Sequence, residues 1–153
     1  MINKIAYNNT TFTGHLAIQA GQGKSVDDII SKIPNEEERI IFKEELDTFQ
    51  KRVESETSDE SNFILTLGHR EWEAGNTLPS GHGITFNVVD TGREHNDSIS
   101  DIYPITRKNG KPWSIGAKFQ SEMKEFFNEL RKSVVQRRNL YEAREKASQR
   151  RYH

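Results

Sequence analysis

Three histidines in the middle third of the chain are the residues most suggestive of chemistry. His69 and His82 stand near the two ends of a long segment between two predicted strands, and each follows a glycine. His95 lies in the next loop. Three imidazoles with a carboxylate from Glu71 or Asp97 would suit zinc, manganese or iron. These histidines are therefore the candidate metal ligands.

The same histidines also suit general acid/base chemistry. One imidazole could act as base and another as acid on a phosphodiester, while Arg70 or Arg93 would stabilise the developing charge. His69, His82, His95 and Arg70 are thus the candidate catalytic residues of a small ribonuclease or metal-dependent hydrolase. Their spacing matches no known metal or nuclease motif, and histidines beside glycine also occur simply as polar turn residues. We assign no catalytic residue, metal or cofactor from the sequence.

A glycine-rich segment, Gly21-Gln-Gly-Lys-Ser25, precedes a predicted helix and resembles the end of a phosphate-binding loop. The complete motif needs a glycine five positions before Gly23, where this chain has Ile18. The NTPase interpretation is therefore disfavoured. A weak anion site or a simple turn remains.

The last forty residues predict one long helix, from Ile115 to about Arg150 with Ser114 as its cap. About 35 residues in helical conformation span roughly 53 Å, whereas a compact domain of this length has a diameter of about 38 Å. An apolar stripe covers the first two thirds of the helix, at Phe119, Met123, Phe126, Leu130 and Val134. We therefore expect the helix to extend beyond its own domain or to lie along a second copy.

Basic residues crowd the end of this helix and a predicted turn before it. A frayed, solvated terminus would explain them, and so would a homodimer contact or a surface for nucleic acid or an acidic protein. Trp72, in a charged loop, could stack on a base or fold back onto the core, and Trp113 is expected in the core. The candidate partner-binding residues are Arg131, Lys132, Arg137, Arg138, Arg144, Lys146, Arg150, Arg151, Lys108, Lys111 and Trp72.

The remaining pattern predicts an α+β fold. Helices are expected over Val26–Ile33 and Glu36–Glu56, the second with a stripe at Phe42, Leu46, Phe49 and Val53 that should pack against the long helix. Strands are expected over Gly14–Ala20, Phe63–Leu67, Ile84–Val89 and Ile102–Thr106, with Pro104 favouring an edge. The prediction is a small, mainly antiparallel sheet of 3–5 strands, a helical hairpin-like N-terminal half and a long C-terminal helix.

Composition restricts the class of protein. The 153 residues predict a single domain, 1–153, with 114–150 as a helix that could project from it. The chain has no cysteine, which excludes disulfides and thiolate chemistry. No signal peptide or membrane span is evident, so we expect a cytoplasmic protein with no membrane partner. Acidic residues dominate Lys24–Glu73 and basic residues dominate Pro104–His153.

Together these features favour a non-catalytic binding or regulatory protein, of the kind that phages and mobile elements encode as regulators or inhibitors. It would act through its basic C-terminal helix on nucleic acid or an acidic protein partner. The alternative is the histidine-based hydrolase. A further alternative is a self-assembling structural subunit. Because only 33% of the residues are hydrophobic, we expect a thin core, which makes a homo-oligomer plausible in any of these cases.

Overall fold

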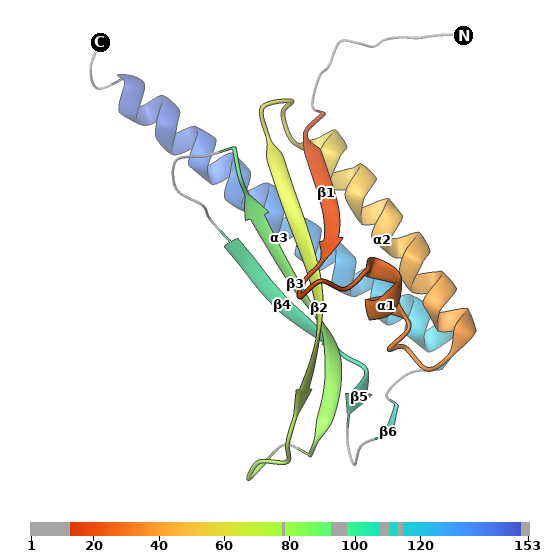
Figure 1. The fold of residues 1–153 in the computed structure, drawn as a ribbon. Helices are drawn as coiled ribbons and strands as arrows, with labels where there is room; N and C mark the ends of the chain where they lie inside the picture. The colour runs from red at the N-terminus through yellow and green to blue at the C-terminus, as the bar shows by residue number, and fades with distance from the viewer. Residues whose placement is uncertain (1–12, 78, 93–97, 108–110, 113–114, 151–153) are drawn as a thin grey trace, which may run out of the picture.

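The computed structural model, which describes residues 13–77, 79–92, 98–107, 111–112 and 115–150, has an α+β fold (Figure 1). The order of elements is the expected one, with two additional short strands. The elements are β1 (His15–Ala20), α1 (Val26–Ile30), α2 (Glu36–Glu56), β2 (Asn62–Trp72), β3 (Gly81–Asp90), β4 (Ser98–Pro104), β5 (Thr106–Arg107), β6 (Lys111–Pro112) and α3 (Ala117–Arg150).

Strands β1 to β4 form one sheet in chain order. The β2–β3 and β3–β4 pairs are antiparallel, whereas β1 runs parallel to β2 because α1 and α2 form the connection between them. β4 is an edge strand, as Pro104 predicted, but it covers Ser98–Pro104 rather than 102–106, and Pro104 is its last residue. The predicted fold class is therefore confirmed, with one parallel pair at the side of a mainly antiparallel sheet.

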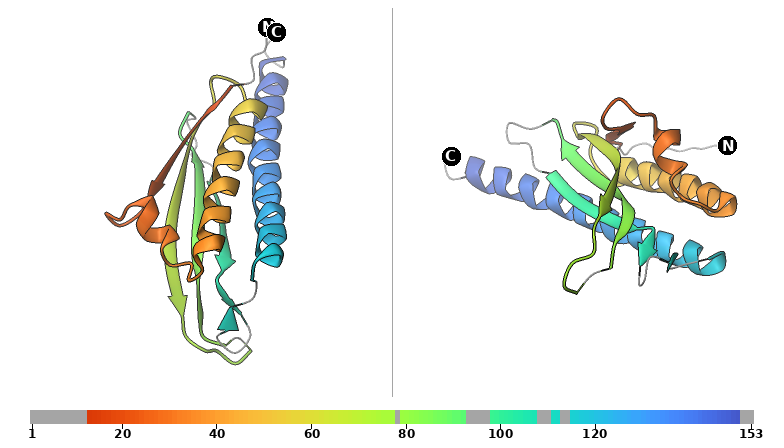
Figure 2. Two further views of the ribbon diagram at one scale, coloured as in Figure 1. Left: turned by 90° about the vertical axis from the view of Figure 1, so that its right-hand side faces the viewer. Right: turned by 60° about the horizontal axis from the view of Figure 1, so that its bottom comes forward.

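Helices α2 and α3 lie side by side against one face of the sheet (Figure 2). Alternate residues of β2 and β3, such as Leu65, Leu67 and Phe86, are buried beneath them. The Phe49 and Phe127 rings meet between the helices, with centroids 5.6 Å apart. The predicted pairing of the two helices is therefore confirmed.

The buried stripe of α3 differs from the prediction at one position. Phe127 is 3% exposed and contacts both Phe42 and Phe49, whereas Phe126 is only partly buried and packs against Phe86 and Tyr103. Both aromatic side chains contribute to the core. Phe127 occupies the junction between the helices, and Phe126 lies between α3 and the sheet.

The strands around the histidines are longer than predicted. Residues 68–72 and 81–83 were expected in a loop, but they extend β2 and β3 and pair with each other, from Gly68↔Thr85 to Trp72↔Gly81. The connection is therefore only the short segment 73–80.

The helix starts follow local side-chain chemistry. Ser25 and Asp28 form a reciprocal capping box at the start of α1, and Asn35 Oδ1 accepts a hydrogen bond from the Glu38 backbone N–H at the start of α2. The Glu38 carboxylate is buried and accepts from the Gly116 backbone N–H at 3.3 Å, which joins α2 to the residues preceding α3. Burial raises the pKa of Glu38, an effect that the Gly116 hydrogen bond opposes.

Candidate functional site

The structure brings His69 and His82 into direct contact. They lie on neighbouring strands in a diagonal position on the same face of the sheet, and His69 Nε2 is 2.8 Å from His82 Nδ1. The His82 backbone is held at the β4–β5 corner, since its N–H donates to Thr106 Oγ1 and its carbonyl accepts from the Ile105 N–H. Strand pairing thus places the two rings next to each other.

This contact determines what the pair can do chemically. Each ring uses one nitrogen on the other, so the two imidazoles share a proton and only one nitrogen of each, His69 Nδ1 and His82 Nε2, is left for another group. Such an arrangement suits a relay in which one imidazole orients the other. An acid and a base on opposite sides of a phosphodiester would require separated rings.

The electrostatic surroundings of His69 are cationic. Burial is the main reason why the pKa of His69 is lowered. The His82 ring, Lys32 and Lys24 lower it further, whereas Glu71 raises it. At neutral pH the His69 imidazole is therefore held in its neutral form, the state that accepts a proton or binds a metal.

A complete metal site is not formed by the part of the chain that the structure describes. No group of three or more histidine, aspartate or glutamate side chains there could hold a metal ion. His95, Arg93 and Asp97 lie outside the described residues, so a third ligand from that loop remains a prediction.

The Gly21–Ser25 segment forms a tight turn. The Lys24 N–H donates to the Gly21 carbonyl at 3.2 Å, and the two central residues, Gln22 and Gly23, have φ of 59° and 70°. Positive φ at both central positions is the signature of a type I′ turn. The glycine at position 23 therefore serves the turn, and the turn places Lys24 beside the end of β1.

A cleft lies next to this turn, around the end of β1 and along residues 66–70 of β2. Its volume is about 510 Å³, and its charged lining residues are Lys24, Lys32 and Arg70, beside His69. Lys32 was not singled out from the sequence. It lies just after a one-turn helix, and no local pattern links it to residues on β2.

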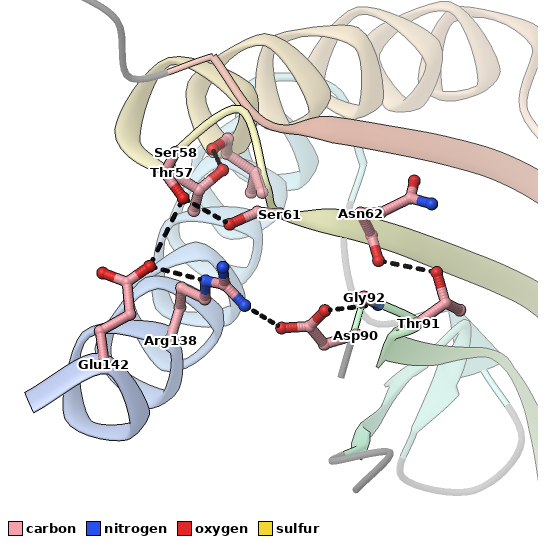
Figure 3. A network of polar contacts seen from close by, with 10 residues as sticks. Thr57, Ser58, Ser61, Asn62, Asp90, Thr91, Gly92, Arg138 and Glu142 are labelled. Atoms are coloured by element: carbon pink, nitrogen blue, oxygen red, sulfur yellow. Dashed lines mark hydrogen bonds and ion pairs between the residues drawn. The ribbon is translucent and has the colours of Figure 1, made fainter. Parts of the chain in front are cut away.

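The predicted partner-binding residues of α3 lie in different surroundings, and Arg138 is the most buried of them. Arg138 is buried, and its Nη1 forms an ion pair with Asp90 Oδ2 at 2.9 Å while its Nε pairs with Glu142 (Figure 3). Glu142 also accepts from the Ser58 hydroxyl, so this network fastens α3 to the end of β3 and to the α2–β2 connection. Arg138 is therefore a structural residue, contrary to its assignment to partner contact.

Two further cations on α3 already have carboxylate partners. Arg131 is largely buried and pairs with Glu56 of α2 at 2.8 Å, and exposed Lys132 pairs with Glu129 one turn earlier at 3.3 Å. Arg137 is exposed and lies beside a small pocket that also includes Ile99 of β4 and Tyr141.

The remaining basic residues of α3 are exposed at its end. All residues from Ala143 to Arg150 are exposed, and this end extends past the sheet and α2 (Figures 1 and 2). Within the described part of the chain, Arg144, Lys146 and Arg150 form no ion pair within 4 Å. This short segment, residues 143–150, is hereafter the α3 tip.

The other predicted contact residues are less informative. Trp72 donates its indole N–H to the Pro79 carbonyl and covers Gly81, so it packs onto the β2–β3 hairpin. Lys111 lies in β6, which pairs with β5, whereas Lys108, Trp113, Ser114 and Arg151 lie outside the described residues.

Asp90 is the principal structural residue that sequence reasoning missed. A signal was present, because Asp90 continues the alternation of Ile84, Phe86 and Val88 toward the buried face of β3. An acid at that position requires a buried partner, and Arg138 follows Val134 by one helical turn.

Comparison of the chain with models of protein families, with characterised proteins and with solved structures finds no match. No helix among the described residues is long and apolar enough to cross a membrane.

Proposed function

We propose that this is a non-catalytic binding protein whose α3 tip contacts nucleic acid. The observation that carries the proposal is the distribution of cations on α3. Arg131, Lys132 and Arg138 are used in ion pairs, while Arg144, Lys146 and Arg150 stand on an exposed helical segment.

The arrangement around the helix favours nucleic acid over an acidic protein surface. Successive residues of an α-helix are about 100° apart, so Arg144 lies on a different side of the helix from Lys146 and Arg150. A flat acidic surface would contact one side only. The major groove admits a helix between two phosphate backbones, and cations on more than one side of the helix can then contact phosphates.

The test is a charge-removal variant of the α3 tip. Arg144→Gln, Lys146→Gln and Arg150→Gln together remove three charges from exposed positions. Lys43→Gln, Lys51→Gln and Lys124→Gln remove three charges elsewhere and form the control. Binding of a fluorescently labelled 20-base-pair duplex is followed by anisotropy at several salt concentrations.

We expect the tip variant to bind at least tenfold more weakly, with the slope of log K against log salt reduced by about one per removed cation. The control variant should retain most of the affinity. Equal binding by wild type and tip variant would refute the proposal. If the protein binds no nucleic acid but binds an acidic polypeptide through the α3 tip, the partner of the tip is an acidic protein and the proposal is wrong.

The histidine-based alternative rests on the 2.8 Å contact between His69 and His82. A relay pair in which the pKa of His69 is lowered could activate a water molecule or a hydroxyl group. Incubation of labelled RNA with wild type and with His69→Ala tests this alternative, which requires cleavage by the wild type and its loss in the variant.

Self-assembly is tested separately by light scattering against the chain mass of 17.7 kDa.

A further inference from the structure

The cleft beside His69 has the features of an anion site. Its three cations come from three different elements: Lys24 from the turn after β1, Lys32 from the residues after α1, and Arg70 from β2. Within the described part of the chain, none of them forms an ion pair within 4 Å. Both lysines interact electrostatically with Asp28, but that carboxylate is already hydrogen-bonded to the Ser25 backbone N–H.

An open strand edge adds backbone donors to this cleft. β1 pairs with β2 only as far as Ala20↔Leu67, and the Gly21 N–H bonds to the Leu67 carbonyl at 2.9 Å, so this carbonyl points toward β1. In a β-strand, the backbone N–H and C=O groups of every second residue point toward the same neighbouring strand. The His69 N–H therefore points toward the same side, beyond the point where β1 ends, and His69 lines the cleft together with the two lysines and Arg70.

The rest of the cleft indicates what the anion is attached to. The volume of about 510 Å³ is much larger than a phosphate ion requires, and Thr66, Thr85 and Asn87 supply polar side chains. The residues lining the cleft include no phenylalanine, tyrosine or tryptophan on which a nucleobase could stack. Hydroxyl groups suit these surroundings better than an aromatic base.

We propose that this cleft binds a small sugar phosphate, with its phosphate held by Lys24, Lys32, Arg70 and the His69 backbone N–H and its hydroxyl groups directed at Thr66, Thr85 and Asn87. This site is distinct from the α3 tip and does not depend on the proposed nucleic-acid binding. The tip variant described above should therefore bind the sugar phosphate as the wild type does.

The experiment is calorimetric titration of the full chain with ribose 5-phosphate, inorganic phosphate and ribose. We expect ribose 5-phosphate to bind about tenfold more tightly than inorganic phosphate, and ribose alone not to bind at millimolar concentration. Lys32→Ala and Arg70→Ala should each weaken the binding of ribose 5-phosphate about tenfold or more, because each removes a charged hydrogen bond. Lys51→Ala, which removes an exposed lysine on α2, should leave it unchanged.

A second readout is the protonation of His69, followed by NMR. The groups that act on this imidazole are His82, Lys32, Glu71 and Lys24. A bound phosphate favours the imidazolium, so saturation with ribose 5-phosphate should raise the pKa of His69, whereas ribose should not. Absence of binding, binding insensitive to both substitutions, or equal affinity for phosphate and ribose 5-phosphate would overturn the proposal.

Discussion

Replacement of Arg138 by methionine tests the conclusion that this arginine is structural. The side chains of Arg138 and Asp90 are only 6% and 7% exposed, and their ion pair measures 2.9 Å. Methionine preserves much of the buried aliphatic volume but removes the Arg138 cation from the Asp90 carboxylate. Removal of one partner from a buried pair costs about 3–5 kcal/mol, because the remaining charge stays desolvated.

This cost can be converted into a melting temperature. For a chain of this size 1 kcal/mol corresponds to about 2–4 °C, so Arg138→Met should lower the melting temperature by roughly 6–20 °C. Lys132→Met is the matched control on the same helix, since Lys132 and Glu129 are 55% and 64% exposed and such a pair contributes less than about 1 kcal/mol. Differential scanning calorimetry measures both.

A double variant separates the ion pair from simple loss of packing. Asp90→Asn removes the charge but keeps an oxygen that can accept from the Gly92 N–H. The combined Asp90→Asn and Arg138→Met variant should therefore be more stable than the sum of the single effects predicts, by about 1.5 kcal/mol or more. If Arg138→Met is no more harmful than Lys132→Met, or if the single effects are additive, the assignment of a buried structural pair is wrong.

Three further predictions concern the core and two titrating groups. Phe127→Ala should lower the free energy of unfolding, measured in urea, by about 3–5 kcal/mol, and Phe126→Ala should lower it clearly less, because only Phe127 is fully buried. A larger loss for Phe126→Ala would support the stripe predicted from the sequence, in which Phe126 is the core residue. Because burial raises the pKa of Glu38, the folded state binds its proton more tightly than the unfolded chain does, and this glutamate destabilises the fold as pH rises above about 4.5. Glu38→Gln should therefore raise the melting temperature at pH 7 but not at pH 3.5, and no gain at pH 7 would contradict this. The pKa of His69 is lowered in the folded state, so as pH decreases below about 6.5 the His69 imidazole is protonated first in the unfolded chain, and the stability of the fold decreases. The His69→Gln variant should therefore lose less stability than the wild type between pH 7.5 and pH 5.5. Parallel curves of stability against pH would refute the lowered pKa of His69.

The element order could be predicted because apolar periodicity encodes it locally. The stripe of α2 and the alternation in β3 each identify an element without knowledge of its neighbours. The ends of β2 and β3 could not be predicted in this way. Gly68 to Trp72 lacks apolar alternation, and these residues are extended because their backbones pair with 81–85.

The exact face of α3 illustrates a different limit. Phe126 and Phe127 follow Met123 by three and four residues, and both spacings place a side chain on the same helical face. The choice between them depends on where α2 and the sheet lie relative to α3. Only the tertiary structure assigns Phe127 to the helix junction and Phe126 to the sheet.

The candidate site was partly predictable for a similar reason. The sequence places His69 and His82, each after a glycine, near the two ends of the segment that joins two predicted strands. The pairing of β2 with β3 brings their rings together. The convergence of Lys24, Lys32 and Arg70 was not predictable, because it depends on where β1 ends relative to β2. No sequence period relates residues from a turn, a helix end and a neighbouring strand.

The net basic charge of α3 therefore overstates how much of it is free for a partner. Arg131 and Arg138 pair with acids of α2 and β3, and their attraction to Glu56 and Asp90 is internal to the fold. A phosphate could reach Arg138 only by displacing Asp90 from a buried position, which would cost more than an exposed contact returns. The cations beyond the last packing contact of the helix, Arg144, Lys146 and Arg150, can respond to salt and to an anionic partner. Substitutions meant to probe binding belong there, because the same changes nearer the core would report on stability instead.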